Sequence, residues 1–255
     1  MGKIIAVVNQ KGGVGKTTTA VNLTAALSGL GLKVLLCDFD PQGNATSGMG
    51  VEKRKVKKDI YDVVIDDVKA EDAIVHTKYG DVLPATADLA GAGVELISME
   101  EPNYRLAKAL SPVKNSYDLI LIDCPPSLEM LTLNGLAAAE GILVPVQCEY
   151  YALEGLSDLM STLRTVKKRI NPALEIFGVA LTMFDGRTNF STQVAQEVRK
   201  HFPGKVYTSV IPRNIRLAEA PSHGMPVTAY DRSSKGAKAY MAMAEEIKQR
   251  LTQKG

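Results

Sequence analysis

The sequence predicts a three-layer α/β fold in which helices cover both faces of a mostly parallel, twisted sheet. Short β-branched runs alternate with longer helical patterns along the whole chain, which is typical of βαβ units. Most of these runs are continuously apolar, as expected for strands that are buried on both faces. The 255 residues are 45% hydrophobic and 23% charged and show no repeat and no linker rich in Pro, Gly or Ser. We therefore expect one domain spanning residues 1–255.

Each predicted element is a segment with its own pattern and end signals. The predicted strands are residues 4–8, 34–37, 82–84, 119–122, 142–146, 176–181 and 206–210. The predicted helices have apolar residues at helical spacing. They are residues 17–30, which end before Gly31, residues 153–170, which end before Asn171 and Pro172, and residues 192–201 and 235–252.

The composition argues against membrane-spanning and secreted proteins. No apolar run approaches the roughly 20 residues that cross a bilayer, and the first residues lack the apolar region and cleavage site of a signal peptide. We therefore expect a cytoplasmic protein. The three cysteines, Cys37, Cys124 and Cys148, are far apart in apolar segments and fit neither a disulfide framework nor paired metal-ligand spacing. They are expected to be reduced and buried.

The net charge of +2 conceals an asymmetry along the chain. Residues 1–150 carry 14 basic and 19 acidic side chains, a balance of −5, whereas residues 151–255 carry 16 and 9, a balance of +7. A basic half can bind a polyanion, although such an imbalance is more often only a solvated surface.

The strongest functional signal lies between the first strand and the first helix, where residues 11–18 read KGGVGKTT. Such a loop directs successive backbone NH groups at an anion, and the following helix adds its positive N-terminal end. Lys16 supplies a charge for the β and γ phosphates, and the Thr17 hydroxyl is placed to bind Mg²⁺ directly. The glycines are needed because a Cβ would collide with a phosphate or forbid a positive φ. The expected nucleotide contacts are Lys11, Gly12, Gly13, Val14, Gly15, Lys16, Thr17 and Thr18.

Acidic residues follow two of the predicted strands. Asp123 ends the apolar run of residues 119–122, and Asp38 and Asp40 follow residues 34–37. Ligands bind at the carboxyl ends of parallel strands in such folds, so we expect Asp123 to hold Mg²⁺ through water. Acids at strand ends can instead cap helices or lie in solvated turns.

The loop departs from the common GxxxxGK[ST] pattern, because Gln10 occupies the first glycine position and Lys11 is an additional lysine. It resembles the deviant Walker A motif, KGGxGK[ST], of the ParA/MinD/NifH class of dimerising P-loop NTPases. The resemblance implies that Lys11 reaches the phosphates bound by a partner subunit while Lys16 acts within its own. From the residues alone, a second cation should help neutralise charge that develops during phosphoryl transfer.

Four further segments resemble the ParA/Soj family. They are DFDPQGNATS (38–47), DCPPS (123–127), PVQCEYYALEGL (145–156) and IPRNIRLAEAPSHGMP (211–226). The resemblance implies an ATP hydrolase that uses Mg²⁺, forms an ATP-dependent homodimer, binds duplex DNA without strong sequence preference and works with a ParB-type centromere-binding protein in chromosome or plasmid segregation on the nucleoid.

The same resemblance assigns individual roles. Asp40 would position or activate the attacking water, and Asp38 would support the metal shell. Both carboxylates would contact Mg²⁺ through water. Pro212 and Asn214 would lie beside the adenine, and Glu149 near the ribose and the partner subunit. Where relatives often place an asparagine for adenine recognition, this chain has Thr182 and Met183, so that base recognition is expected to use backbone groups.

Candidate DNA contacts come from the basic half of the chain. Arg187 and Arg216 are the first choices because each is expected in a loop after an apolar strand without a partner on a helix face. Arg213 and Lys235 are further candidates. No recognition-helix signature precedes them, so sequence-specific readout is not expected. A second basic cluster, residues 53–58 (KRKVKK), is expected to be mainly a solvated loop.

Three rival functions remain. A MinD-like ATPase cycling on a membrane needs an amphipathic C-terminal helix with an exposed apolar face, whereas the apolar residues of 235–252 lie at core-packing intervals; no membrane partner is expected. An iron-sulfur reductase needs paired cysteines in exposed loops. A scaffold that only binds nucleotide would not need Asp40 and Asp123.

Overall fold

The computed structural model describes residues 2–149 and 152–252, whose strands form one seven-stranded sheet in the order β3-β4-β2-β5-β1-β6-β7. The strands are β1 (Lys3–Val7), β2 (Val34–Asp38), β3 (Val75–Thr77), β4 (Gly80–Leu83), β5 (Leu119–Asp123), β6 (Gly141–Gln147) and β7 (Glu175–Thr182). Only the edge strand β3 is antiparallel to its neighbour. The expected mostly parallel sheet is confirmed.

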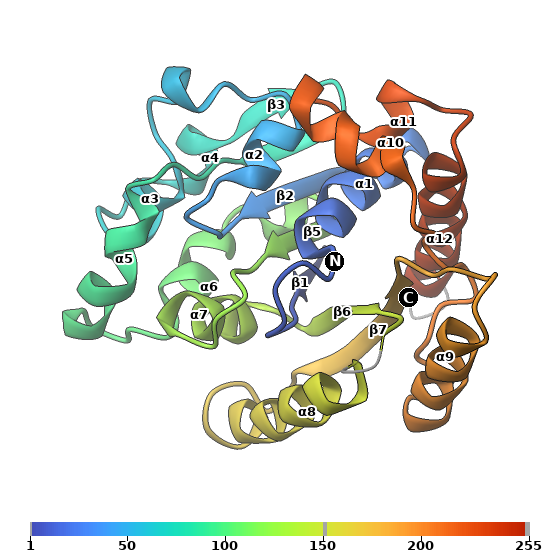
Figure 1. Ribbon diagram of the computed structural model, residues 1–255. Coiled ribbons are helices and arrows are strands. Elements are labelled where there is room, and N and C mark those ends of the chain that lie inside the picture. Colours follow the sequence, from blue (N-terminus) through green and yellow to red (C-terminus); the bar gives the residue numbers. More distant parts are fainter. Residues whose placement is uncertain (1, 150–151, 253–255) are drawn as a thin grey trace.

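Helices of very different length surround the sheet (Figure 1). The α-helices are α1 (Lys16–Gly29), α2 (Asn44–Gly48), α3 (Ile60–Val64), α4 (Ala70–Ala73), α5 (Leu89–Glu95), α6 (Arg105–Leu110), α7 (Met130–Ala138), α8 (Ala152–Arg169), α9 (Asn189–His201), α10 (Ile215–Glu219), α11 (Val227–Tyr230) and α12 (Lys235–Thr252); the 3-10 helices are η1 (Lys53–Lys55), η2 (Leu96–Ser98), η3 (Lys114–Ser116) and η4 (Ala220–His223). The four predicted helices correspond to α1, α8, α9 and α12. The other helices were not predicted, and most of them are too short to show a helical period.

The side chains of β1 explain why both faces of the sheet are covered. Ile4 and Ala6 belong to one buried cluster, with side chains from α3 and α5 to α9, and Ile5 and Val7 belong to the other, with side chains from α1, α11 and α12. Figure 1 shows α1, α11 and α12 on one side of the sheet and α6, α7 and α8 on the other. Apolar side chains on both faces of a strand are therefore buried, each in the cluster on its own side of the sheet.

Strand register brings the predicted acidic segments together. Asp123 of β5 pairs in register with Asp38 of β2 on one side and with Val7 of β1 on the other. The loop of residues 11–18 follows β1, and the segment containing Asp40 follows β2. The carboxyl ends of three adjacent strands thus deliver all the candidate residues for phosphate and metal binding to one edge of the sheet.

One predicted strand is wrong, and one strand was missed. Residues 206–210 run beside β7 but form only an isolated bridge between Val206 and Val179. The amides of Thr208 and Ser209 donate instead to the Glu246 carboxylate of α12, at 2.9 and 2.7 Å, so no continuous ladder forms. The strand predicted at 82–84 is the second half of a hairpin whose first strand, β3, has only three residues.

Two expectations concern membranes and thiols. Among residues 2–149 and 152–252, no helix combines the length and the apolar character that crossing a membrane would require. Cys37, Cys124 and Cys148 are buried and unpaired, as expected. Burial raises the pKa of each of the three thiols. An iron-sulfur reductase would need exposed, reactive cysteines, whose thiol pKa is lowered instead.

Candidate nucleotide-binding site

The glycine-rich loop has the geometry that its sequence predicts. Gly13 and Gly15 have φ values of 74° and 88°, which glycine adopts without strain, and Gly15 caps α1. A Cβ at Gly12 or Gly13 would meet no atom within 4 Å. Neither contacts within the described residues nor a positive φ therefore require glycine at position 12, and the space beside Gly12 and Gly13 is open.

Lys16 is a nearly buried cation at the start of α1. It is 8% exposed, and its ammonium group donates to the carbonyl of Lys11 at 3.3 Å. Burial lowers the pKa of Lys16, while the charges of Asp123 and Asp40 act in the opposite direction. A buried ammonium group with so few partners is suited to an anionic ligand.

A cavity of about 260 Å³ lies above this loop. Besides the loop, it is lined by Asp40 from the segment after β2, by Pro126 from the segment after β5, and by Met183 from the end of β7. The residues that the structure places around it are Gly12, Gly13, Gly15, Lys16, Thr17, Thr18, Asp40, Pro126 and Met183. Cationic and hydroxyl groups from the loop and a carboxylate from the segment after β2 therefore converge on one space.

Asp123 is the most unusual group of the site. It is completely buried, and neither carboxylate oxygen makes a hydrogen bond of ordinary geometry within the described residues, although the Thr17 hydroxyl lies close to it. Burial, followed by the neighbouring charge of Asp38, raises its pKa, and the adjacent Thr17 hydroxyl and Lys16 act in the opposite direction. A buried acceptor without a donor is costly unless a cation or water satisfies it, so the donor set here fits a hydrated divalent cation.

Asp38 is also completely buried but is well satisfied. Its Oδ2 accepts hydrogen bonds from the amide and the hydroxyl of Thr46, both at 2.7 Å. Burial raises the pKa of Asp38 to about 6, although the bonds from Thr46 oppose this. Thr46 was not singled out from the sequence, where a threonine eight residues after an acid carries no signal; its two hydrogen bonds hold the Asp38 carboxylate in place.

Asp40 differs from both because it lies in a turn at the border of the cavity. Its Oδ1 accepts from the amide of Gln42 at 3.0 Å, and its carbonyl accepts from the amide of Gly43 at 2.9 Å. The carboxylate is half-buried and faces the space above Lys16 and Thr17. This location is compatible with a group that contacts water near the end of a bound polyphosphate.

A second cavity, of about 360 Å³, adjoins the first and shares Gly15, Thr18 and Met183 with it. Pro212 and Asn214, which the family resemblance predicts to lie beside the adenine, line it. Most of the lining is apolar, with Ile211, Ile215, Leu217, Ala218 and Tyr240 among the lining residues. A flat apolar base can occupy this cavity while its phosphates extend into the first. Tyr240 was not predicted here, because it lies on a distant helix.

The free polar groups of the second cavity are limited. The Thr182 hydroxyl donates to the carbonyl of Val14, and the Tyr240 hydroxyl bonds that of Thr19. The side-chain Oδ1 of Asn214 accepts from the amide of Arg216 at 3.1 Å. Met183 follows β7 with a φ of 49°, an uncommon conformation for this residue type. Arg213 also lines this cavity, and the use of backbone groups for base recognition stays a prediction.

Lys11 and Glu149 contact each other within the chain. Their side chains form an ion pair across the entrance to the loop, and both are about one-third exposed. The structure therefore brings together two residues with different expected contacts. Lys11 was expected to reach phosphates bound by a partner subunit, and Glu149 was expected near the ribose and the partner subunit. The amide of Lys11 also donates to the Asn9 side chain at 3.0 Å, which fixes the start of the loop.

The candidate DNA contacts require one correction. The expectation for Arg216 is wrong: it lies on α10 instead of in a loop, and it pairs with Glu219 of that helix and with Asp231. Arg187 lies in a loop before α9, as expected, but it pairs there with Asp185. Arg187 lowers the pKa of Asp185 to about 2. Arg213 and Lys235 are exposed and form no ion pair within the part of the chain that the structure describes.

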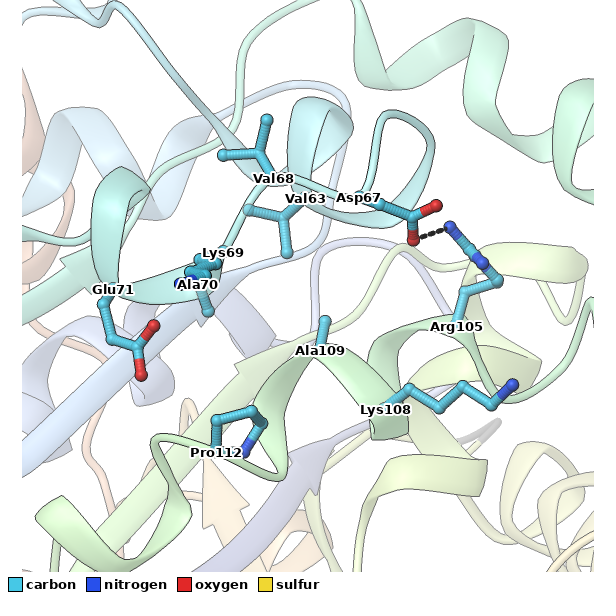
Figure 2. A pocket seen from close by; sticks show the side chains of 10 residues that line it. All are labelled: Val63, Asp67, Val68, Lys69, Ala70, Glu71, Arg105, Lys108, Ala109 and Pro112. Carbon is cyan, nitrogen blue, oxygen red and sulfur yellow. Dashed lines mark hydrogen bonds and ion pairs between the residues drawn. The ribbon is translucent and has the colours of Figure 1, made fainter.

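A third cavity, of about 360 Å³, lies beside α4 and α6 (Figure 2). Its apolar wall includes Val63 and Ala109, and its border carries charged side chains. The guanidinium group of Arg105 pairs there with Asp67 and donates to the carbonyl of Val64. None of the residues predicted to bind nucleotide, metal or DNA lines it, so it is separate from the candidate site.

Comparisons with known proteins agree with this description. A family model described as an AAA domain matches residues 2–176. The sporulation initiation inhibitor protein Soj of Bacillus subtilis is 56% identical over 249 residues, which cover 97% of this chain and 98% of that protein. The chromosome partitioning protein ParA of Myxococcus xanthus is 49% identical over 256 residues, covering 100% and 90% of the two chains.

Solved structures share the fold over the full chain. A Mycobacterium smegmatis protein named cobyrinic acid a,c-diamide synthase, with a bound ATP analog and magnesium, has a TM-score of 0.87 and 36% identity, with 100% of this chain and 98% of that one covered. The septum site-determining protein MinD of Pyrococcus horikoshii, complexed with Mg-ADP, has a TM-score of 0.82 and 30% identity, covering 100% and 99%.

Proposed function

Because this chain belongs to the ParA/Soj family of chromosome-partitioning ATPases, we propose that it is a Mg²⁺-dependent ATP hydrolase whose ATP-bound form dimerises and binds duplex DNA. In this role it drives chromosome or plasmid segregation with a ParB-type partner, in the cytoplasm and on the nucleoid. One observation carries the proposal: Lys16, Thr17 and Asp40 line one cavity, beside a completely buried Asp123 whose carboxylate has no partner within the described residues.

Nucleotide binding uses the two adjoining cavities. The base enters the apolar cavity beside Pro212 and Asn214, and the triphosphate lies along the loop toward Lys16. The backbone NH groups and the N-terminal end of α1 stabilise the phosphate charge. The two solved neighbours hold nucleotide and magnesium, which supports the same ligands here.

The acidic residues bind the metal ion and orient the attacking water. Mg²⁺ would be held by the Thr17 hydroxyl directly and by Asp38, Asp40 and Asp123 through water, and it would neutralise charge on the phosphates. Asp123, which lacks a partner within the described residues, gains one in this arrangement. Thr46 keeps Asp38 in place, and Asp40 orients the attacking water from its turn at the border of the cavity.

Dimerisation requires Lys11 to exchange partners. In the single chain its ammonium group pairs with Glu149, and that bond must open before Lys11 contacts phosphates bound by a second copy. Because both side chains are partly exposed, the pair contributes little to stability. The exchange is therefore energetically accessible when a more highly charged partner is offered.

The DNA-binding proposal rests on Arg213 and Lys235, which form no ion pair within the described residues, with Arg187 and Arg216 joining when phosphates displace their carboxylates. Backbone phosphate contacts give affinity without sequence preference and weaken as salt rises. Two chains in a dimer offer twice as many contacts as one, and this links nucleotide state to DNA affinity.

The test uses two variants and duplex DNA of arbitrary sequence. Asp40→Ala should bind ATP and DNA and lose hydrolysis, whereas Lys16→Ala should lose nucleotide binding. Binding of Asp40→Ala to DNA is measured with ATP, with ADP and without nucleotide over a salt series. Tight, salt-sensitive binding that occurs with ATP but not with ADP or without nucleotide supports the proposal. An Asp40→Ala variant that hydrolyses ATP at the normal rate would refute the assigned mechanism.

The structure favours this function over membrane cycling. Five residues of α12 that would have to face a lipid surface are buried, namely Ala237, Tyr240, Met243, Ala244 and Ile247. They belong to the core cluster that includes α1. A helix used in this way is a structural part of the fold and does not present an apolar face to a membrane.

A further inference from the structure

The turn that carries Asp40 is fixed by only a few hydrogen bonds. Within residues 40–43, the amide of Gly43 donates to the Asp40 carbonyl, and the amide of Gln42 donates to the Asp40 carboxylate. Gly43 has a φ of 60° and caps α2. Both bonds lie inside the turn. The Asp40 amide also donates to the Asp38 carboxylate at 3.4 Å, and the Ser47 amide donates to the Gly43 carbonyl at 3.2 Å, so these further bonds come from the same segment, residues 38–47.

Lys53 supplies an external bond. Its ammonium group donates to the carbonyl of Gln42 at 2.8 Å. Within the described residues, this is the only hydrogen bond that residues 40–43 receive from outside the segment 38–47. The aliphatic part of Lys53 also covers the turn, because a Cβ at Gly43 would lie 2.8 Å from its Cδ.

Lys53 differs from its basic neighbours in the cluster of residues 53–58. Lys55 pairs with Glu52, and Lys58 pairs with Asp72. Lys53 forms no ion pair within the described residues, and neither do Arg54 and Lys57, but of these three only Lys53 donates a side-chain hydrogen bond there, to the neutral Gln42 carbonyl. A cation at the N-terminal end of α2 opposes the helix dipole, so helix stabilisation does not account for its place.

The segment that bears Lys53 is itself tied to the metal side of the site. The amide of Val51 donates to the carbonyl of Thr46 at 3.2 Å, and Thr46 holds Asp38. Hydrogen bonds therefore connect Asp38 to Thr46 and Thr46 to the segment before η1, and the Lys53 side chain bonds the turn that carries Asp40. This closed path links the two acidic residues of one segment.

We propose that Lys53 is a positioning residue for Asp40: its ammonium group, bonded to the Gln42 carbonyl, holds the turn of residues 40–43 in the orientation that presents the Asp40 carboxylate to the cavity. This inference rests on the proposed role of Asp40 in ATP hydrolysis. It assigns to residues 53–58, expected to be mainly a solvated loop, one member with a defined task at the site.

The experiment compares three variants without DNA. Lys53→Met keeps the aliphatic packing and removes the donor, Lys53→Arg restores a donor, and Lys55→Met is the matched control on the same 3-10 helix. A charge-assisted hydrogen bond commonly shifts a local equilibrium by roughly tenfold. We expect Lys53→Met to lower kcat by about three- to tenfold with less than a twofold change in KM, and Lys53→Arg to recover most of the loss.

Amide hydrogen exchange gives a second readout that does not depend on activity. In Lys53→Met, the amides of Gln42 and Gly43 should exchange about three- to tenfold faster, whereas those of β5 should be unchanged. Lys53→Met behaving like Lys55→Met in both measurements would overturn the proposal. Faster exchange with normal kcat would overturn its link to Asp40, and full activity of Asp40→Ala would instead identify the proposed function as the error.

Discussion

Replacing Asp123 with asparagine should make the nucleotide-free protein more stable while it removes the response to ligand. The carboxylate is completely buried at the end of β5, has no hydrogen-bond partner within the described residues, and lies in register with a second acid, Asp38. Asparagine has nearly the same shape and carries no charge. The substitution therefore removes an unpaired buried charge and a like-charge repulsion together.

The size of the effect follows from two opposing contributions. An unpaired buried charge costs several kcal/mol after relaxation, and the new amide is left without partners at a cost of about 1–3 kcal/mol. A net gain of about 1–2 kcal/mol remains. For a chain of this length, about 2–4 °C per kcal/mol gives a rise in Tm of roughly 2–8 °C.

The assay is thermal unfolding at pH 8 with and without Mg²⁺ and ATP. In the unmodified protein, ligand at about 100 times Kd adds about 2.7 kcal/mol, and in Asp123→Asn this shift should nearly vanish. Asp118→Asn, an exposed aspartate directly before β5 that accepts from the Lys33 amide, is the control and should leave the ligand shift intact. A less stable ligand-free Asp123→Asn, or an undiminished ligand shift, would refute the reasoning that a cation completes this site.

Two further predictions concern contacts that no sequence pattern indicated. Tyr240→Phe removes the hydroxyl that bonds Thr19 at 3.1 Å but keeps the ring in the wall of the base cavity. It should lower the free energy of unfolding by about 1 kcal/mol and change ATP affinity less than twofold, by denaturant titration and calorimetry. Glu246→Gln removes the charge that accepts from the amides of residues 208–209. Burial alone would raise the Glu246 pKa, but these bonds and the Ser209 hydroxyl lower it overall. Because the folded pKa is depressed, the stabilisation is present above the ordinary glutamate pKa and is lost as pH falls through the folded value. Glu246→Gln should therefore be less stable than the unmodified protein at pH 7, and the difference should disappear toward pH 3; an equal difference at both values would contradict the assignment.

The parts of the site that the sequence could predict are those encoded locally. The loop of residues 11–18 carries its own φ requirements, helix start and cation, so its conformation depends little on distant segments. Asp38 and Asp123 were predictable because each ends a continuously apolar run, and a parallel sheet brings such ends together. The position of Asp40 followed from its separation from Asp38 by one residue.

The parts that could not be predicted depend on pairs that only the fold creates. Asp231 reaches Arg216 from beyond η4 and α11, and Glu149 reaches Lys11 from the end of β6. Residues 206–210 have a strand-like composition, but Glu246 from α12 competes for their amides. A sequence pattern describes what a segment favours alone and contains no information about a carboxylate tens of residues away.

The ion pairs at the basic surface sharpen the proposed link between ATP and DNA. If only Arg213 and Lys235 contact phosphates, one chain neutralises about two and a dimer about four, so log K should fall with log salt with slopes of about −1.8 and −3.6. If Arg187 and Arg216 also leave their carboxylates, the slopes double to about −3.6 and −7.2. Each of these arginines must then break bonds to Asp185, or to Glu219 and Asp231, and this cost lowers affinity without lowering the slope. A dimer with a steep slope but modest affinity would therefore indicate that all four cations bind, whereas a shallow slope would show that the two paired arginines stay with their own carboxylates.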